Sequence, residues 1–197
     1  MKIGIVGLGT SLPSRRVTND ELATTLDTSD EWIRTRTGIG ARRIAADDVD
    51  VTDLATEAAQ KALDDAGLTV EDIGLIVVGT ATGRAFPSTA CIVQERLGAR
   101  GATAFDISAA CSGFIFALQT AASMLTTVEG KHALVIGAEK MSSIVDWSDR
   151  STAILFGDVQ GQSSSDQLSK RVLMPSSLEQ MDAEHIYYLR TLMDQSR

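Results

Sequence analysis

Between residues 2 and 137, short apolar segments rich in β-branched residues alternate with longer segments of helical periodicity. The pattern predicts strands at 2–7, 73–79, 102–107 and 133–137, and helices at 52–66, 88–97 and 110–125. Segments that alternate in this way form a mainly parallel sheet with right-handed crossovers and with helices on its faces. The sequence therefore predicts an α/β fold.

Capping signals add two short helices before the first long one. Thr18 with Glu21, and Thr28 with Glu31, have the three-residue spacing of a capping box. Gly67 follows the long helical pattern directly, as glycine does where a helix ends.

Composition changes after Asp158. Residues 1–158 hold 15 of the 16 glycines, whereas the last 39 residues hold both tyrosines and three of the six methionines. Residues 159–175 begin with a polar stretch rich in Ser and Gln, which predicts a linker. Residues 176–197 have apolar positions at helical spacing and predict an amphipathic tail helix. We expect three parts: a unit at 1–158, a linker and a tail helix.

Charge and cysteine usage exclude several classes of protein. A net charge of −8 disfavours general nucleic-acid binding, which requires a basic surface. No apolar stretch is long enough for a membrane span, and no signal-peptide pattern opens the chain. Cys91 and Cys111 lack metal-ligand spacing and are too few for a disulfide framework. We expect a cytoplasmic protein without a metal site.

The helix expected at 110–125 is apolar or small on every side, which predicts burial all round. A second layer of helices or another chain must then cover its outer side. Cys111 stands near its beginning, where the chain leaves a strand. The amides and dipole of a helix N-terminus favour a thiolate, and thus a nucleophile. A free cysteine is also a common buried small residue, so both interpretations stay open at this point.

The segment Asp106–Phe114 resembles the nucleophile segment of the β-ketoacyl-acyl-carrier-protein (ACP) synthase III family, in the thiolase superfamily. Four further segments agree in the family's order: 7–13, 30–39, 86–91 and 149–158. The resemblance covers residues 1–158 and implies the thiolase fold, in which two similar α/β halves enclose a layer of buried helices, usually as a homodimer. It also implies decarboxylative Claisen condensation of acyl-CoA with malonyl-ACP, which initiates fatty-acid or polyketide synthesis. No permanently bound cofactor is implied, since acyl-CoA is a substrate.

The resemblance assigns roles to individual residues. Cys111 matches the acylated nucleophile, and its backbone amide would help to form the oxyanion hole. Trp32 and Arg150 match the pair that sandwiches the adenine of CoA. Arg36 and Thr37 belong to the same matching segment and are expected at the nucleotide end of CoA. Without that match, Trp32 would be interpreted as a half-buried packing residue.

The same resemblance places Phe86 in the loop that approaches the partner subunit's acyl pocket, and assigns Phe156 to the substrate pocket. Six arginines crowd into one basic stretch: Arg15, Arg16, Arg34, Arg36, Arg42 and Arg43. Such a cluster suits CoA phosphates or an acidic carrier protein, and it equally suits a solvated surface. Both interpretations of the cluster stay open.

The sequence departs from the family in its second part. The family's catalytic His and Asn stabilise the enolate and thioester oxyanions, but neither His132 nor His185 stands in a matching context. We find no resemblance after residue 158, and therefore expect a first half joined to an unrelated tail, with impaired condensation. The alternative is a non-catalytic remnant or an interaction subunit that pairs through the 110–125 helix. The acyl-chain preference is not determined.

A nicotinamide site is also excluded at the N-terminus. Gly4, Gly7 and Gly9 follow a predicted strand, but their spacing is not Gly-x-Gly-x-x-Gly, and Pro13 stands where a helix would open.

Overall fold

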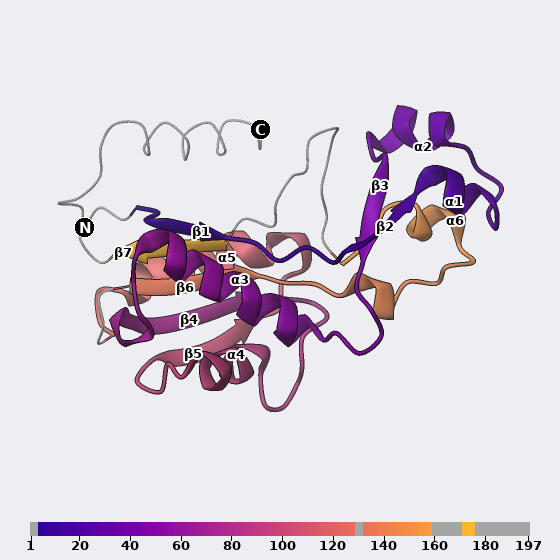
Figure 1. Cartoon of the computed structure of the whole chain (residues 1–197). Helices are drawn as coiled ribbons and strands as arrows, with labels where there is room; N and C mark the ends of the chain where they lie inside the picture. The colour runs from indigo at the N-terminus through magenta and orange to yellow at the C-terminus, as the bar shows by residue number, and fades with distance from the viewer. Residues whose placement is uncertain (1–3, 129–131, 159–170, 176–197) are drawn as a thin grey trace.

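The computed structural model describes residues 4–128, 132–158 and 171–175, and its centre is a five-stranded mixed sheet (Figure 1). The strands stand in the order β1 (Gly7–Gly9), β7 (Arg171–Pro175), β6 (His132–Gly137), β4 (Ile73–Gly79) and β5 (Thr103–Ile107). β4 is parallel to both β5 and β6, whereas β7 is antiparallel to β6 and β1. The α/β prediction is confirmed.

Helices cover both faces of this sheet. α3 (Val51–Ala66) and α4 (Thr89–Leu97) pack on one face, and α5 (Gly113–Met124) packs on the other. The 3₁₀ turns η1 (Val70–Asp72) and η2 (Ala110–Ser112) precede β4 and α5.

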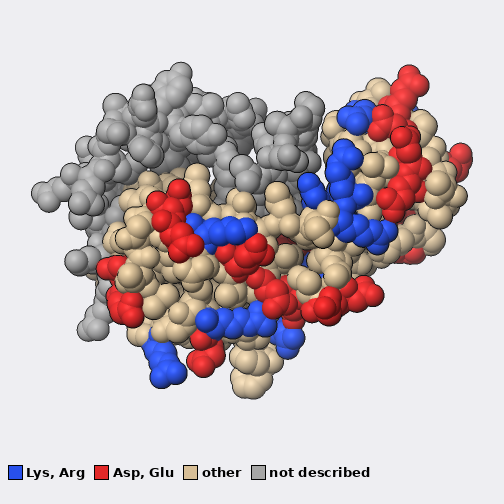
Figure 2. All heavy atoms as spheres, viewed as in Figure 1, with Lys and Arg blue, Asp and Glu red and all other residues tan. Residues whose placement is uncertain are grey.

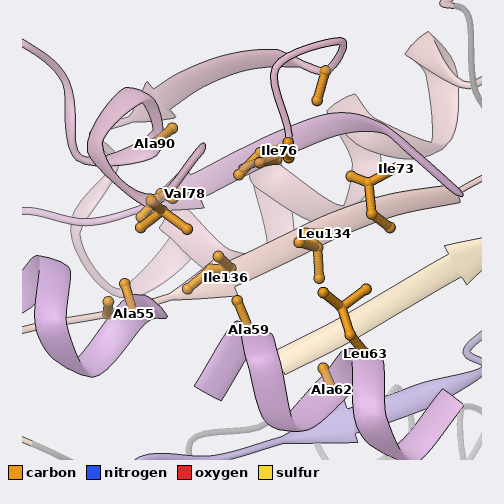
Figure 3. Packing of buried hydrophobic residues seen from close by; sticks show 14 of the residues in the cluster. Ala55, Ala59, Ala62, Leu63, Ile73, Ile76, Val78, Ala90, Leu134 and Ile136 are labelled. Carbon is orange, nitrogen blue, oxygen red and sulfur yellow. The ribbon is translucent and has the colours of Figure 1, made fainter. Parts of the chain in front are cut away.

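The alternation of side chains along β4 explains why this strand is apolar throughout. Ile76 and Val78 belong to the core shared with α3 and α4 (Figure 3), whereas Leu75 and Val77 belong to the core shared with α5. All four side chains are fully buried. Successive residues of a strand point to opposite faces, so a strand buried on both faces shows no polar alternation.

The glycines of β1 permit close packing on α3. A Cβ atom on Gly7 would lie 2.5 Å from the carbonyl oxygen of Ala62, and one on Gly9 would clash with the backbone at Ala58 and Ala62. Gly7 and Gly9 therefore serve helix–strand packing.

A smaller lobe lies beside the sheet (Figure 1). It contains the antiparallel ribbon of β2 (Arg15–Thr18) and β3 (Ala41–Ile44), with helices α1 (Asn19–Ala23), α2 (Asp30–Thr37) and α6 (Arg150–Ala153). Its core is a separate cluster: Val17, Leu22, Leu26, Ile33, Ala153 and Ile154. The 3₁₀ turn η3 (Met141–Ser143) lies in the segment that joins β6 to α6.

Several predicted boundaries need correction. The first strand is β1 at Gly7–Gly9 rather than 2–7, and residues 2 and 3 of the predicted strand lie outside the described part. Ser29, not Thr28, caps α2, because its hydroxyl oxygen accepts the amide of Trp32. The end of the predicted linker is β7, and the predicted tail helix 176–197 lies outside the described residues.

Candidate functional site

Cys111 lies in the turn that joins β5 to α5. The helix expected from residue 110 begins instead at Gly113, and Cys111 belongs to the preceding 3₁₀ turn η2. The amide of Ser112 donates to the carbonyl of Ala109 at 3.0 Å, and Ala110 has a φ of 45°. A positive φ is unfavourable for a residue with a Cβ atom and is often found at functional turns. Cys111 is exposed, so the interpretation of a buried packing cysteine is excluded.

Close backbone contact holds this turn against the sheet. A Cβ atom on Gly79, at the end of β4, would lie 2.7 Å from the carbonyl carbon of Gly113. The amide of Thr80 donates to the carbonyl of Ile107 at 3.0 Å, which joins the ends of β4 and β5. The start of α5 therefore rests directly on the end of the sheet, where parallel-sheet proteins place their sites.

Asp106 connects the Cys111 segment to the loop that carries Phe86. Its carboxylate oxygens accept the amides of Thr89 and Ala90, in the first turn of α4, at 2.8 and 2.7 Å. Phe86 stands in the loop before that helix and is 94% exposed. One carboxylate thus anchors the Phe86 loop to the strand that leads to Cys111.

Glu139 fixes the beginning of the same loop. Its carboxylate accepts the amides of Ala81 and Thr82 at 2.7 and 3.0 Å, and the hydroxyl of Thr82 at 2.6 Å. Sequence analysis did not single out Asp106 or Glu139. The available signal was an acidic residue in, or just after, an otherwise apolar strand.

Three of the four predicted nucleotide-binding residues meet in the smaller lobe. The guanidinium carbons of Arg36 and Arg150 lie 4.2 and 4.8 Å from the ring centroid of Trp32, within cation–π range. Arg150 also donates to the backbone carbonyl of Asp27 at 2.8 Å. Trp32 is half-buried, packs on the core of this lobe and has both guanidinium groups against its ring. An indole and planar cations are groups that can stack on a purine.

Thr37, the fourth predicted residue, has its hydroxyl engaged locally. The hydroxyl donates to the carbonyl of Ile33 at 2.8 Å and accepts the amide of Ile39 at 3.0 Å. Its side chain thereby closes the end of α2.

Three of the six arginines of the basic stretch are paired or buried within the chain. Arg34 pairs with Asp30 at 2.7 Å, and Arg15 pairs with Glu21 at 3.0 Å. Arg42 is only 4% exposed, and burial lowers its pKa to about 10. Acidic side chains stand beside the basic ones over the smaller lobe (Figure 2).

Phe156 is half-buried and lies shortly after α6, where its amide donates to the carbonyl of Thr152 at 3.3 Å. Cys91 is half-buried in α4, with its sulfur 3.8 Å from the carbonyl of Ala104, and both cysteines are free thiols. His132 is the first residue of β6, whereas His185 lies outside the described residues.

The outer side of α5 is open in the described part of the chain. Ala117 and Ala121 are fully buried against the sheet, whereas Ile115 and Phe116 are 58% and 48% exposed. The apolar outer side that was expected to need a cover is therefore uncovered by the described residues.

Metal and membrane sites find no support in the described residues. They contain no group of three or more metal-ligating side chains. None of the helices in this part of the chain is both long and apolar enough to span a bilayer.

The comparisons with known proteins agree with this geometry. The sequence pattern of the 3-oxoacyl-ACP synthase III family matches residues 105–161, which include Cys111. The β-ketoacyl-ACP synthase III of Geobacillus kaustophilus is 56% identical over 162 residues, which cover 82% of this chain and 52% of that protein. This chain belongs to the β-ketoacyl-ACP synthase III family.

Other synthase III relatives extend the match. The Aquifex aeolicus protein is 49% identical over 195 residues, covering 94% of this chain and 63% of the relative, so the alignment passes residue 158. Its crystal structure matches with a TM-score of 0.81 at 48% identity, over 91% of this chain and 55% of that chain. The priming β-ketosynthase of the R1128 polyketide pathway matches with a TM-score of 0.80 at 36% identity, over 89% and 50%. The chain spans about half the length of most of these relatives.

Proposed function

We propose that Cys111 accepts an acyl group from acyl-CoA, as the first step of a β-ketoacyl-ACP synthase III reaction that initiates fatty-acid or polyketide synthesis. The observation that carries the proposal is the exposed thiol in the strained turn before α5, inside the segment that matches the family. Relatives that share this segment are named β-ketoacyl-ACP synthase III.

The proposed acyl transfer is a thioester exchange. The Cys111 sulfur, as a thiolate, attacks the carbonyl carbon of the acyl-CoA thioester, and the bond from that carbon to the CoA sulfur breaks. CoA leaves as a thiolate and takes up the proton that the cysteine released. The backbone amide of Cys111 would stabilise the negative oxygen of the tetrahedral intermediate.

The nucleotide end of CoA would bind at the smaller lobe. Trp32 and Arg150 offer an indole and a planar cation for the adenine, and Arg36 adds positive charge beside them. Thr37 lies on the same helix, with its hydroxyl used to close that helix.

The proposed second step joins the acyl group to malonyl-ACP. The malonyl group loses carbon dioxide, the resulting enolate attacks the acyl-cysteine carbonyl, and the Cys111 thiolate leaves. A single oxyanion donor contributes about 3 to 4 kcal/mol to such a step.

Intact-mass spectrometry after incubation with acetyl-CoA tests the first step. The wild-type chain should gain the mass of one acetyl group, Cys91→Ala should gain it equally, and Cys111→Ala should not. An unmodified wild-type chain under all short acyl-CoA donors would refute the proposal and favour a non-catalytic role. Release of carbon dioxide from malonyl-ACP then measures condensation separately.

A second copy of the chain is the proposed cover for α5. Phe86, Ile115 and Phe116 are exposed apolar side chains, and exposed patches of this kind favour association. Light scattering at micromolar concentration should show a dimer or larger assembly, and Phe116→Ser should weaken it. A folded wild-type monomer at that concentration would contradict this proposal.

A further inference from the structure

Two buried polar side chains connect the helices that carry Trp32 and Arg150. Arg42, on β3, donates through Nη2 to the carbonyl of Ile154 and to Oδ1 of Asn19, both at 2.9 Å. Ile154 ends α6, the helix that begins with Arg150. This half of the connection therefore holds α6 against the ribbon.

Asn19 continues the connection to α2. Its Nδ2 donates to Oδ1 of Asp30 at 2.8 Å and to the carbonyl of Ile39 at 2.7 Å. Asp30 is the first residue of α2, two positions before Trp32, and it also accepts Nε of Arg34 at 2.7 Å. Hydrogen bonds thus run without a break from the end of α6 to the start of α2.

We propose that Arg42 and Asn19 are positioning residues for the nucleotide end of the acyl-CoA substrate, because they set the spacing between α2 and α6. This inference rests on the proposed function of the chain. Neither residue touches the ligand in this proposal, and both act through the helices that carry Trp32 and Arg150.

Burial and charge support a positioning role for Arg42. Its side chain is 96% buried, and the three atoms that accept its hydrogen bonds are two backbone carbonyls and the amide oxygen of Asn19. Its Nε has no acceptor among the described residues. The carboxylate of Glu21 acts on Arg42 only through its charge, which raises the pKa of Arg42 and opposes the larger effect of burial. A buried cation whose hydrogen bonds all go to neutral acceptors is a costly way to stabilise a core, whereas directional hydrogen bonds specify one geometry.

The geometry also explains how a purine enters. Stacking a purine between Trp32 and Arg150 requires about 7 Å between the two planes, which is two van der Waals contacts. The guanidinium now lies 4.8 Å from the ring centroid, so the exposed tip of Arg150 must move outward. The hydrogen bonds of Arg42 hold the backbone of α6 in place while that tip moves.

Two acetyl donors separate positioning from folding. Acetyl-CoA carries the nucleotide, whereas the acetyl thioester of pantetheine lacks it, and under the proposed function both acylate Cys111. For Asn19→Asp, which keeps the side chain's shape but removes the donor to Asp30, we expect at least a tenfold rise in the acetyl-CoA concentration that gives half-maximal acylation. Its maximal rate, and its acylation by acetyl-pantetheine, should stay within about twofold of wild type.

Other variants control for stability. Asp30→Ala is the substitute test if Asn19→Asp does not fold, because the side chain of Asp30 is half-exposed. It should also raise the acetyl-CoA concentration that gives half-maximal acylation. Val93→Ala creates a cavity in the main core and should lower the melting temperature without changing the ratio between the two donors. Circular dichroism establishes that each variant is folded at the assay temperature.

The outcomes are distinguishable. Equal losses with both donors, or no change with acetyl-CoA, would overturn the positioning role. If wild type accepts acetyl from both donors at equal half-maximal concentrations, the nucleotide contributes nothing and only this inference fails. If wild type is acylated by neither donor, the proposed function fails as well.

Discussion

Alanine should destabilise the fold at Gly79 but not at Gly113, although these two glycines near Cys111 are in contact with each other. Gly79 ends β4, Gly113 begins α5, and their backbones are in direct contact. A Cβ atom on Gly79 would lie 2.7 Å from the carbonyl carbon and 2.8 Å from the carbonyl oxygen of Gly113. A Cβ atom on Gly113 would lie 3.6 Å from the Cα of Gly79, which is ordinary contact. The contact is therefore close on one side only.

The expected magnitudes follow from these distances. Gly79→Ala forces the start of α5 away from the sheet, and overpacking of this kind costs about 1 to 3 kcal/mol of unfolding free energy. Gly113→Ala should be neutral or stabilising by up to about 1 kcal/mol, because Gly113 has helical dihedrals and alanine favours them. For a chain of this length, each kcal/mol shifts the melting temperature by about 2 to 4 °C.

Thermal unfolding followed by circular dichroism measures both effects. The melting temperature should fall by about 2 to 12 °C for Gly79→Ala and should stay level or rise for Gly113→Ala. The rate of Cys111 alkylation by iodoacetamide, measured by mass spectrometry, should change only for Gly79→Ala, because only that variant moves the turn. Equal destabilisation by both variants, or no effect of Gly79→Ala, would refute the one-sided contact.

Two further substitutions, with one control, test carboxylates that hold the site. Asp106→Asn keeps one acceptor oxygen but directs an amide at the first turn of α4, so urea unfolding should show a loss of about 1.5 to 3 kcal/mol. As its control, Arg96→Gln removes an exposed ion pair and should cost less than about 1 kcal/mol. Hydrogen bonds from Arg34 and then Asn19 lower the pKa of Asp30 below its ordinary 3.8, so its ionised form stabilises the fold above that pH. The stability difference between wild type and Asp30→Asn should therefore shrink as the pH falls from about 5 towards 3, and a difference that is constant with pH would contradict this assignment.

Signals from neighbouring residues were sufficient to predict the long helices α3 and α4 and the strand β4. β4 was predicted at its observed bounds, and α3 and α4 begin within one residue of the prediction. Glycines that end helices, and hydroxyl or carboxylate side chains that begin them, act within one turn, so their effect is readable from neighbouring residues. The start of α5 was missed because the 3₁₀ turn at Cys111 depends on a glycine contact with β4.

In the candidate site too, some residues could be identified from the sequence and others only from contacts between distant segments. The resemblance identified Cys111, Trp32 and Arg150 residue by residue, and the structure shows that Trp32 and Arg150 are in contact. Arg42 was grouped with surface arginines because its charge is visible in the sequence and its burial is not. Asn19 was missed because it looks like an ordinary helix-start residue until the chain brings α6 and α2 together.

The sequence by itself determined the α/β class, the bounds of α3, α4, β4, β5 and β6 to within one residue, and the family to which the chain belongs. Those properties depend on residues close together in the chain, or on motifs that can be matched position by position. Tertiary structure alone decided that Cys111 is exposed, that Arg42 is buried, and that the Asp106 carboxylate joins the Phe86 loop to β5. Such contacts join residues far apart in the chain, and no local pattern encodes the distance between them.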